Sequence, residues 1–171
     1  MYKRCKTLAS SERQKEFEHT LLMLMEKQSF KEITVSALCR EMGAPRKAFY
    51  RYFDSIEDVL CALMDEILQA AFLHMEVRLE MEKFFEYWKG QKGLLDVLEK
   101  NGLSQKLMDR SYTLIMTSEK LEAMTTKEMM YAGYVSAILT LVIMWHHNGM
   151  QQSPEEMEEL AGRMFIGKME N

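Results

Sequence analysis

The feature that most constrains the fold of this chain is the helical spacing of its apolar residues. Near the N-terminus, Phe17, Leu21 and Met25 recur at intervals of four, which places them on one face of an α-helix. Similar stripes continue along the sequence, and strand-like alternation is nearly absent. Pro45 and Pro154 are the only prolines, and each stands where a helix is expected to begin. The pattern therefore predicts an all-α protein.

Local signals divide the chain into helices joined by short turns. Thr34 is suited to cap a helix because its hydroxyl can accept a hydrogen bond from an amide of the first turn, and Gly43 is suited to end that helix. Ser153 precedes a proline and two glutamates, which is a strong start signal. We expect helices over residues 11–27, 35–42, from Pro45, from Ser55 or Ile56, 127–147 and 153–168.

Charge is distributed unevenly along the chain. Residues 1–53 carry 11 Lys or Arg and 6 Asp or Glu, whereas residues 54–171 carry 11 and 20. A basic head on an acidic body indicates that the head meets an anionic partner, although N-terminal segments are also often mildly basic without such a role. We expect two domains, residues 1–54 and residues 55–171.

The segment "GAPRKAFYRYF" (43–53) combines basic and aromatic residues in a short space. On a helix that turns about 100° per residue, its basic residues and one tyrosine fall within an arc of about 140°. Phe49 and Phe53 point away from the middle of that arc, toward a core. The predicted exposed face consists of Arg46, Lys47, Tyr50 and Arg51.

Two short helices across a glycine turn, with a third helix packed against them, are the outline of a helix-turn-helix. Arg and Lys side chains on such a helix can reach guanine edges in the major groove, while tyrosine hydroxyls and further basic groups can hold phosphates. Thr34 and Ser36 begin the preceding helix, where a phosphate oxygen could bind. A plain cap accounts for Thr34 equally well, and a solvated basic helix is the alternative for the whole segment.

Residues 11–60 resemble the DNA-binding head of TetR-like (tetracycline-repressor family) transcriptional regulators. The family pattern "TV..IA...GVS...FY.HF..KE.L" is similar to "TVSALCREMGAPRKAFYRYFDSIEDVL" in this chain. The resemblance implies that Tyr50 and Tyr52 contact phosphates and that Arg46, Lys47 and Ala48 face bases. Together the two arguments give the DNA-binding candidates Thr34, Ser36, Arg46, Lys47, Ala48, Tyr50, Arg51 and Tyr52.

The head departs from the family pattern at three positions. Ala44 stands where a valine is usual, and Pro45 stands where a capping serine is usual. Ile56 stands where the fourth helix usually begins with a phosphate-binding lysine. Losing one phosphate contact lowers the salt dependence of DNA binding by roughly one unit.

The segment 131–165 resembles the last two helices of the family, which pair with their copies as a four-helix bundle. A helix that is apolar nearly all round must be buried on several sides, either by a partner subunit or by the core of a monomer. The resemblance therefore implies a homodimer, with residues 55–171 as a dimerisation and effector-binding domain. The dimer-interface candidates are Tyr134, Ile138, Leu141, Trp145, Met157, Leu160 and Met164.

The chain contains 17 methionines, many of them in the body. Methionine adapts to irregular space, which would suit a pocket for apolar ligands, although ordinary core packing explains it as well. The resemblance places a small-molecule effector pocket between residues 56 and 145. The pocket candidates are Phe72, Met75, Phe84, Phe85, Trp88, Met108, Tyr112 and Met116.

Neither catalysis nor a cofactor is indicated. The adjacent residues His146 and His147 point about 100° apart on a helix and cannot chelate one metal ion together. The sequence shows no nucleophile motif and no phosphate-cradling glycine loop. The three cysteines follow no disulfide or zinc spacing. We expect a protein that is not an enzyme and that binds no metal.

The expected location is the cytoplasm. The N-terminus carries no apolar signal-peptide core. The longest apolar run, residues 131–145, has 15 residues, whereas a membrane helix needs about 20. We expect no membrane partner.

The sequence as a whole indicates a regulator that binds a palindromic operator in double-stranded DNA as a dimer and is released by a small molecule. The alternative is a TetR-like fold that acts as a protein-binding coregulator without contacting DNA.

Overall fold

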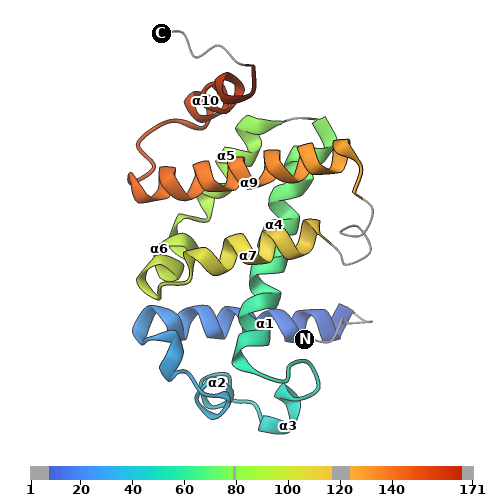
Figure 1. Ribbon diagram of the computed structural model, residues 1–171. Coiled ribbons are helices and arrows are strands. Elements are labelled where there is room, and N and C mark those ends of the chain that lie inside the picture. Colours follow the sequence, from blue (N-terminus) through green and yellow to red (C-terminus); the bar gives the residue numbers. More distant parts are fainter. Residues whose placement is uncertain (1–7, 79, 117–123, 167–171) are drawn as a thin grey trace. The chain divides into compact units, whose positions relative to one another are not determined.

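The computed structural model describes residues 8–78, 80–116 and 124–166, and all regular structure in these ranges is helical (Figure 1). The all-α prediction is confirmed. The elements are α1 (Leu8–Lys27), η1 (Phe30–Glu32), α2 (Val35–Glu41), α3 (Arg46–Phe49), α4 (Ile56–Arg78), α5 (Met81–Gly90), α6 (Lys92–Lys100), α7 (Ser104–Ile115), α9 (Thr126–His147) and α10 (Pro154–Ile166).

The chain divides into two compact units. The head unit comprises the residues up to Ile67 together with Val97–Gly102, and the body unit comprises Leu68–Asp96 and the residues from Leu103 onward. Helices α4 and α6 each contribute residues to both units. The functional boundary expected after residue 54 stays a prediction.

The core of the head unit is built around Phe17 of α1. Its ring centroid lies 5.6 Å from that of Phe49 and 6.0 Å from that of Phe53, both in edge-on geometry. All three side chains are fully buried, as are Leu21 and Met25 on the same face of α1. The stripe expected from the sequence therefore faces the core, because every fourth residue returns to one side of a helix.

The turn between α2 and α3 closes around Gly43. This residue has a φ of +65°, in the left-handed region. Its N–H donates to the carbonyl of Arg40, and the N–H of Ala44 donates to the carbonyl of Cys39. These two bonds form a Schellman motif, which satisfies the last carbonyls of α2. The glycine that the sequence marked as a stop signal ends the helix because it adopts this conformation at little cost.

Replacing Gly43 with alanine is expected to destabilise the head unit by about 1–2 kcal/mol, since a Cβ atom strains the left-handed conformation. A Cβ at this position would meet no atom within 4 Å, so the cost comes from the backbone alone. Gly93→Ala in α6 is the control, because its surroundings are equally open and its φ is not positive. That variant is expected to gain about 0.5–1 kcal/mol in helix propensity. Chemical denaturation of both variants checks the opposite signs.

A distant segment closes the C-terminal end of α1. Asn101 Nδ2 donates to the carbonyl of Met25 at 3.3 Å, and Lys100 Nζ donates to the carbonyl of Glu26 at 2.7 Å. Asn101 Oδ1 accepts from the N–H of Phe30 at 2.7 Å. The last carbonyls of a helix have no hydrogen-bond donor within the helix, so Asn101 and Lys100 supply donors for two of these carbonyls in α1. No local pattern in the sequence indicates this role.

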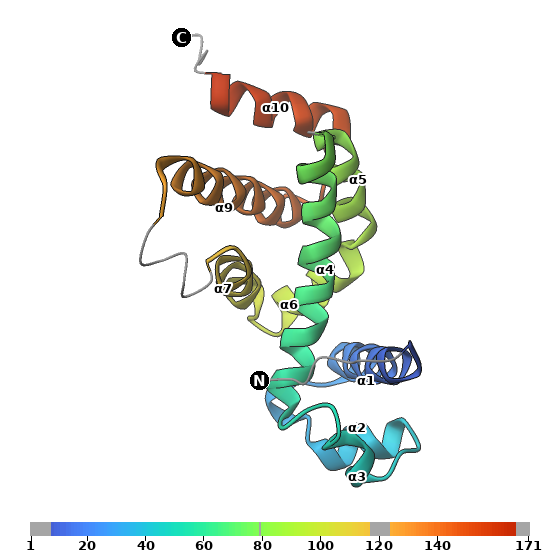
Figure 2. The ribbon, with the colours of Figure 1, turned by 90° about the vertical axis from the view of Figure 1, so that its right-hand side faces the viewer.

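In the body unit, α9 packs beside α7 and α10 packs on α5 (Figure 1, Figure 2). Helix α5 buries its aromatic face completely, with Phe84, Phe85 and Trp88 all inaccessible to solvent. The ring of Phe85 meets that of Trp145 edge-on at 5.8 Å. Aromatic side chains bury large apolar areas, so this cluster forms the centre of the unit.

Helix α9 begins with a capping box. The hydroxyl of Thr125 accepts from the N–H of Glu128 at 3.3 Å, and the Glu128 carboxylate accepts from the N–H of Thr125 at 2.9 Å. Within the described residues, α9 is long and apolar enough to cross a membrane. However, 39% of its most apolar stretch is already buried inside the protein. On the surface of α9 that is not buried, Met130 is 71% exposed and Met144 is 62% exposed.

Candidate nucleic-acid interface

Helix α3 and the residues that follow it present Arg46, Lys47 and Arg51 beside buried aromatic side chains. The helix is one turn long, and Pro45 is its N-cap residue without a side-chain cap bond. Lys47 and Arg51 are exposed, whereas Phe49 and Phe53 are fully buried. The division into an exposed basic face and a buried aromatic side thus agrees with the helical angles of the sequence.

Arg46 and Tyr50 form a joined pair on this face. The guanidinium Nη2 donates to the phenol oxygen at 3.1 Å, and the guanidinium carbon lies 5.9 Å from the centre of the ring. The hydrogen bond to Tyr50 raises the pKa of Arg46, which therefore stays charged. Tyr50 is 43% exposed. Because guanidinium carries five donors, the pair can also offer hydrogen bonds to a base or a phosphate.

Thr34 caps α2, as the sequence indicated. Its Oγ1 accepts from the N–H of Ala37 at 3.1 Å. Both Thr34 and Ser36 are exposed. The cap uses the hydroxyl oxygen as an acceptor, so the Thr34 O–H can still donate to a phosphate. The geometry is therefore compatible with Thr34 acting as a cap alone and with Thr34 acting as a cap that also contacts a phosphate.

The two remaining DNA-binding candidates are half-buried. Ala48 lies on the inner edge of α3. The Tyr52 ring packs against Phe17, with centroids 6.2 Å apart. Tyr52 therefore stabilises the head core in addition to any contact its hydroxyl makes.

The start of α4 is capped by its own side chains. Ser55 Oγ accepts from the N–H of Asp58 at 3.1 Å, and the Asp58 carboxylate accepts from the N–H of Asp54 at 3.2 Å. Ile56 is the first residue of the helix, and Glu57 follows it on the surface. Where the family pattern has a lysine, this helix start therefore presents an apolar residue among acidic ones.

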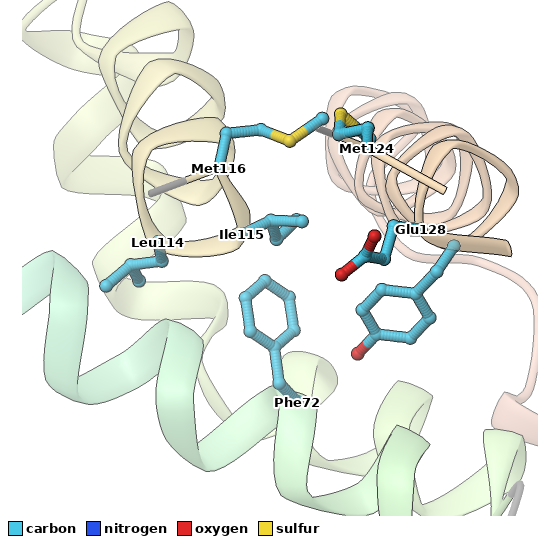
Figure 3. A pocket seen from close by; sticks show the side chains of 7 residues that line it. Phe72, Leu114, Ile115, Met116, Met124 and Glu128 are labelled. Atoms are coloured by element: carbon cyan, nitrogen blue, oxygen red, sulfur yellow. The ribbon is translucent and has the colours of Figure 1, made fainter. Parts of the chain in front are cut away.

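The body unit contains a cavity of about 130 Å³ between the end of α7 and the start of α9 (Figure 3). Of the pocket candidates, Phe72 and Met116 line it. Phe84, Phe85 and Trp88 are core residues instead, because α5 turns them inward. Met108 is half-buried and Tyr112 is 51% exposed, both away from the lining, and the Met75 side chain lies outside the described residues. Among the described residues, the lining consists of Phe72, Leu114, Ile115, Met116, Met124, Glu128 and Tyr131.

The dimer-interface candidates separate into three groups by their exposure to solvent. Ile138, Trp145 and Met157 are buried within the body unit itself and offer no surface to a partner. Leu160 and Met164 are exposed on α10, by 43% and 49%. Tyr134 and Leu141 are half-buried, and the Tyr134 hydroxyl lies 3.2 Å from Met81 Sδ.

A helix-turn-helix with an exposed basic face defines a DNA-binding head, and two family profiles match the chain around it. The profile described as "Bacterial regulatory proteins, tetR family" matches residues 19–63. The profile described as "Transcriptional regulator C-terminal region" matches residues 78–167. A search of curated proteins found no match. The chain belongs to the tetR family of bacterial regulatory proteins.

Membership of this family sets the general activity. The protein is a DNA-binding transcriptional regulator and not an enzyme. Regulators of this family are soluble proteins that bind DNA operators and small-molecule effectors, usually as dimers.

Proposed function

We propose that this protein is a transcriptional repressor that binds a palindromic operator as a homodimer and leaves it when a small molecule binds the body unit. The exposed face formed by Arg46, Lys47, Tyr50 and Arg51 is the observation that carries the proposal. Such a face supplies bidentate donors for guanine and point charges for phosphates. Its rigid support by Phe49 and Phe53 keeps these groups in one orientation.

An exposed apolar stripe supports the homodimer. Met130, Ala137 and Met144 are spaced seven residues apart on α9, so they share one face of the helix. Gly133 is exposed on the same face and would allow a second helix to approach closely. Leu160 of α10 adds a further exposed apolar side chain. Two copies joined there would carry two heads to two half-sites, as a palindrome requires.

An effector would release the dimer from DNA if it bound more tightly to a form in which the two heads are spaced differently. A ligand shifts such an equilibrium only by the difference between its affinities for the two states. The cavity near Phe72 and Met116 is the place where this ligand would bind. In the released state, the heads would no longer fit successive major grooves.

The test is enrichment of sheared genomic DNA by the protein, followed by sequencing. We expect a palindromic peak for the wild type and for Lys89→Ala, an exposed lysine in the body unit. The Lys47→Ala/Tyr50→Ala variant is expected to lose affinity by about 100-fold or more, since each contact is worth about 1–3 kcal/mol. Binding to the recovered site should lose about one unit of salt dependence in Lys47→Ala alone.

One observation favours a second candidate, a coregulator that binds a protein partner instead of DNA. The start of α4 has Ile56 in place of a lysine, with Asp54 and Glu57 exposed beside it. These carboxylates repel phosphates. Absence of any enriched site at low salt, for wild type and variants alike, would make the coregulator the better conclusion.

A further inference from the structure

We propose that the cavity of the body unit binds a small organic cation with a compact apolar group, such as an aryl-substituted ammonium ion. The inference rests on the proposed function, because it specifies the chemical class of the effector. Three properties of the cavity carry it: its size, its apolar walls and a single carboxylate among its lining residues.

The size of the cavity selects a small ligand. Its volume is about 130 Å³. A protein cavity of about 150 Å³ holds one benzene molecule. The site therefore accommodates a ligand portion about as large as one six-membered ring.

The walls are apolar and polarisable. Leu114, Ile115 and two methionines form the α7 side and the approach to α9. The Phe72 ring enters the cavity from α4 and points toward Ile115 (Figure 3). Tyr131 adds a second aromatic ring to the lining. Aromatic faces attract ammonium groups, and thioether sulfur adapts to ligands of irregular shape.

Two polar groups interrupt these walls, the hydroxyl of Tyr131 and the negatively charged carboxylate of Glu128. Glu128 directs its carboxylate into the space beside Phe72 (Figure 3). The N–H and the hydroxyl of Thr125 donate to its Oε2 at 2.9 and 2.8 Å, which fixes the side chain at the start of α9. Among the described residues, none of the seven that line the cavity is basic. The carboxylate would repel an anionic ligand, whereas a neutral ligand would gain apolar contacts and hydrogen bonds but no charge pairing.

Calorimetric titration of the full chain with three ligands of similar size tests this inference at pH 7. Benzylammonium, benzyl alcohol and benzoate share one ring and differ in charge. We expect benzylammonium to bind about tenfold more tightly than benzyl alcohol. The reason is that the carboxylate and the two aromatic rings attract a partly desolvated cation. Benzoate should bind most weakly.

Glu128→Gln is the matched variant. Glutamine also completes a capping box, so the start of α9 is expected to survive the change, which circular dichroism checks. The variant should lose most of the preference for benzylammonium over benzyl alcohol, with the affinity for the alcohol unchanged. A uniform loss of both ligands would instead indicate a damaged cavity and would overturn the role of the charge.

Two results would overturn the inference without touching the DNA-binding part of the proposal. Equal binding of all three ligands would exclude a cation-selective site, and binding of none would exclude a ligand site of this size. Operator affinity is then measured separately, with and without benzylammonium. Tight, charge-dependent binding of the cation with no change in operator affinity would support the ligand class and contradict ligand-controlled release.

Discussion

Replacing Phe17 with alanine is expected to lower the free energy of unfolding of the head unit by about 3–5 kcal/mol. The side chain is fully buried and meets Phe49 and Phe53 edge-on. Its removal deletes buried apolar area and leaves a cavity that the two neighbouring rings cannot fill. Because the same rings support the basic face of α3, DNA binding should be lost together with stability.

Chemical denaturation measures this loss, and Leu8→Ala on the same helix is the control. Leu8 is 78% exposed, so its truncation should change the free energy of unfolding by no more than about 0.5 kcal/mol. A Phe17→Ala variant as stable as the Leu8→Ala variant would contradict the description of the head core.

Glu18 gives the second large expected effect. The side chain lies in the head unit with 3% of its surface exposed, and Gln14 Nε2 donates to its Oε1 at 2.9 Å. Burial raises the pKa of Glu18 to about 7, and the nearby Glu66 carboxylate acts in the same direction. The hydrogen bond from Gln14 and the charge of Lys15, which is paired with Glu66, oppose the shift. The α1–α4 contact therefore holds a carboxyl that is half protonated near neutral pH.

The sign of the pH dependence follows from this raised pKa. In the unfolded chain Glu18 loses its proton near pH 4.5, whereas in the folded protein it keeps the proton until about pH 7. The folded state binds more protons between these values, so stability falls as the pH rises through that window and then levels off. Glu18→Gln removes the cost of the buried charge. The variant is expected to be more stable than the wild type by about 2–3 kcal/mol at pH 8, and equal to it near pH 4.

Denaturation curves at pH 4, 6 and 8 check the Glu18→Gln variant against Glu12→Gln, an exposed acid on the same helix. The control should follow the wild type at each pH. A Glu18→Gln gain that does not grow between pH 4 and pH 8 would show that the pKa of Glu18 is the same in the folded and the unfolded chain.

The sequence by itself predicted the helices at the two ends of the chain and the exposed basic face of residues 46–51. These features depend on local rules: a period of 3.6 residues, a hydroxyl at a helix start and a glycine where φ is positive. Gly43 therefore ends α2 as expected, and Phe49 and Phe53 separate from Lys47 as the helical angles require. Residues a few positions apart decide each of these features.

The side chains that line the cavity followed from the sequence only in part. Phe72 and Met116 were identified, but Phe84 and Trp88 belong to the core. Both groups are large and apolar, and composition does not separate a core residue from a lining residue. Glu128 was not among the predicted pocket residues, because the candidates were chosen as large apolar side chains.

Only the tertiary structure decided which polar groups meet across the fold. Asn101 hydrogen-bonds to the carbonyl of Met25 across 76 positions of sequence, and no local pattern records that partnership. Glu18 is a charged residue at the edge of the apolar stripe of α1, yet it is buried, and burial raises its pKa with a smaller contribution from Glu66 of α4. The physical reason is the same in both cases. Burial and hydrogen-bond partners depend on which elements pack together, whereas the local rules of the sequence act within one helix or turn.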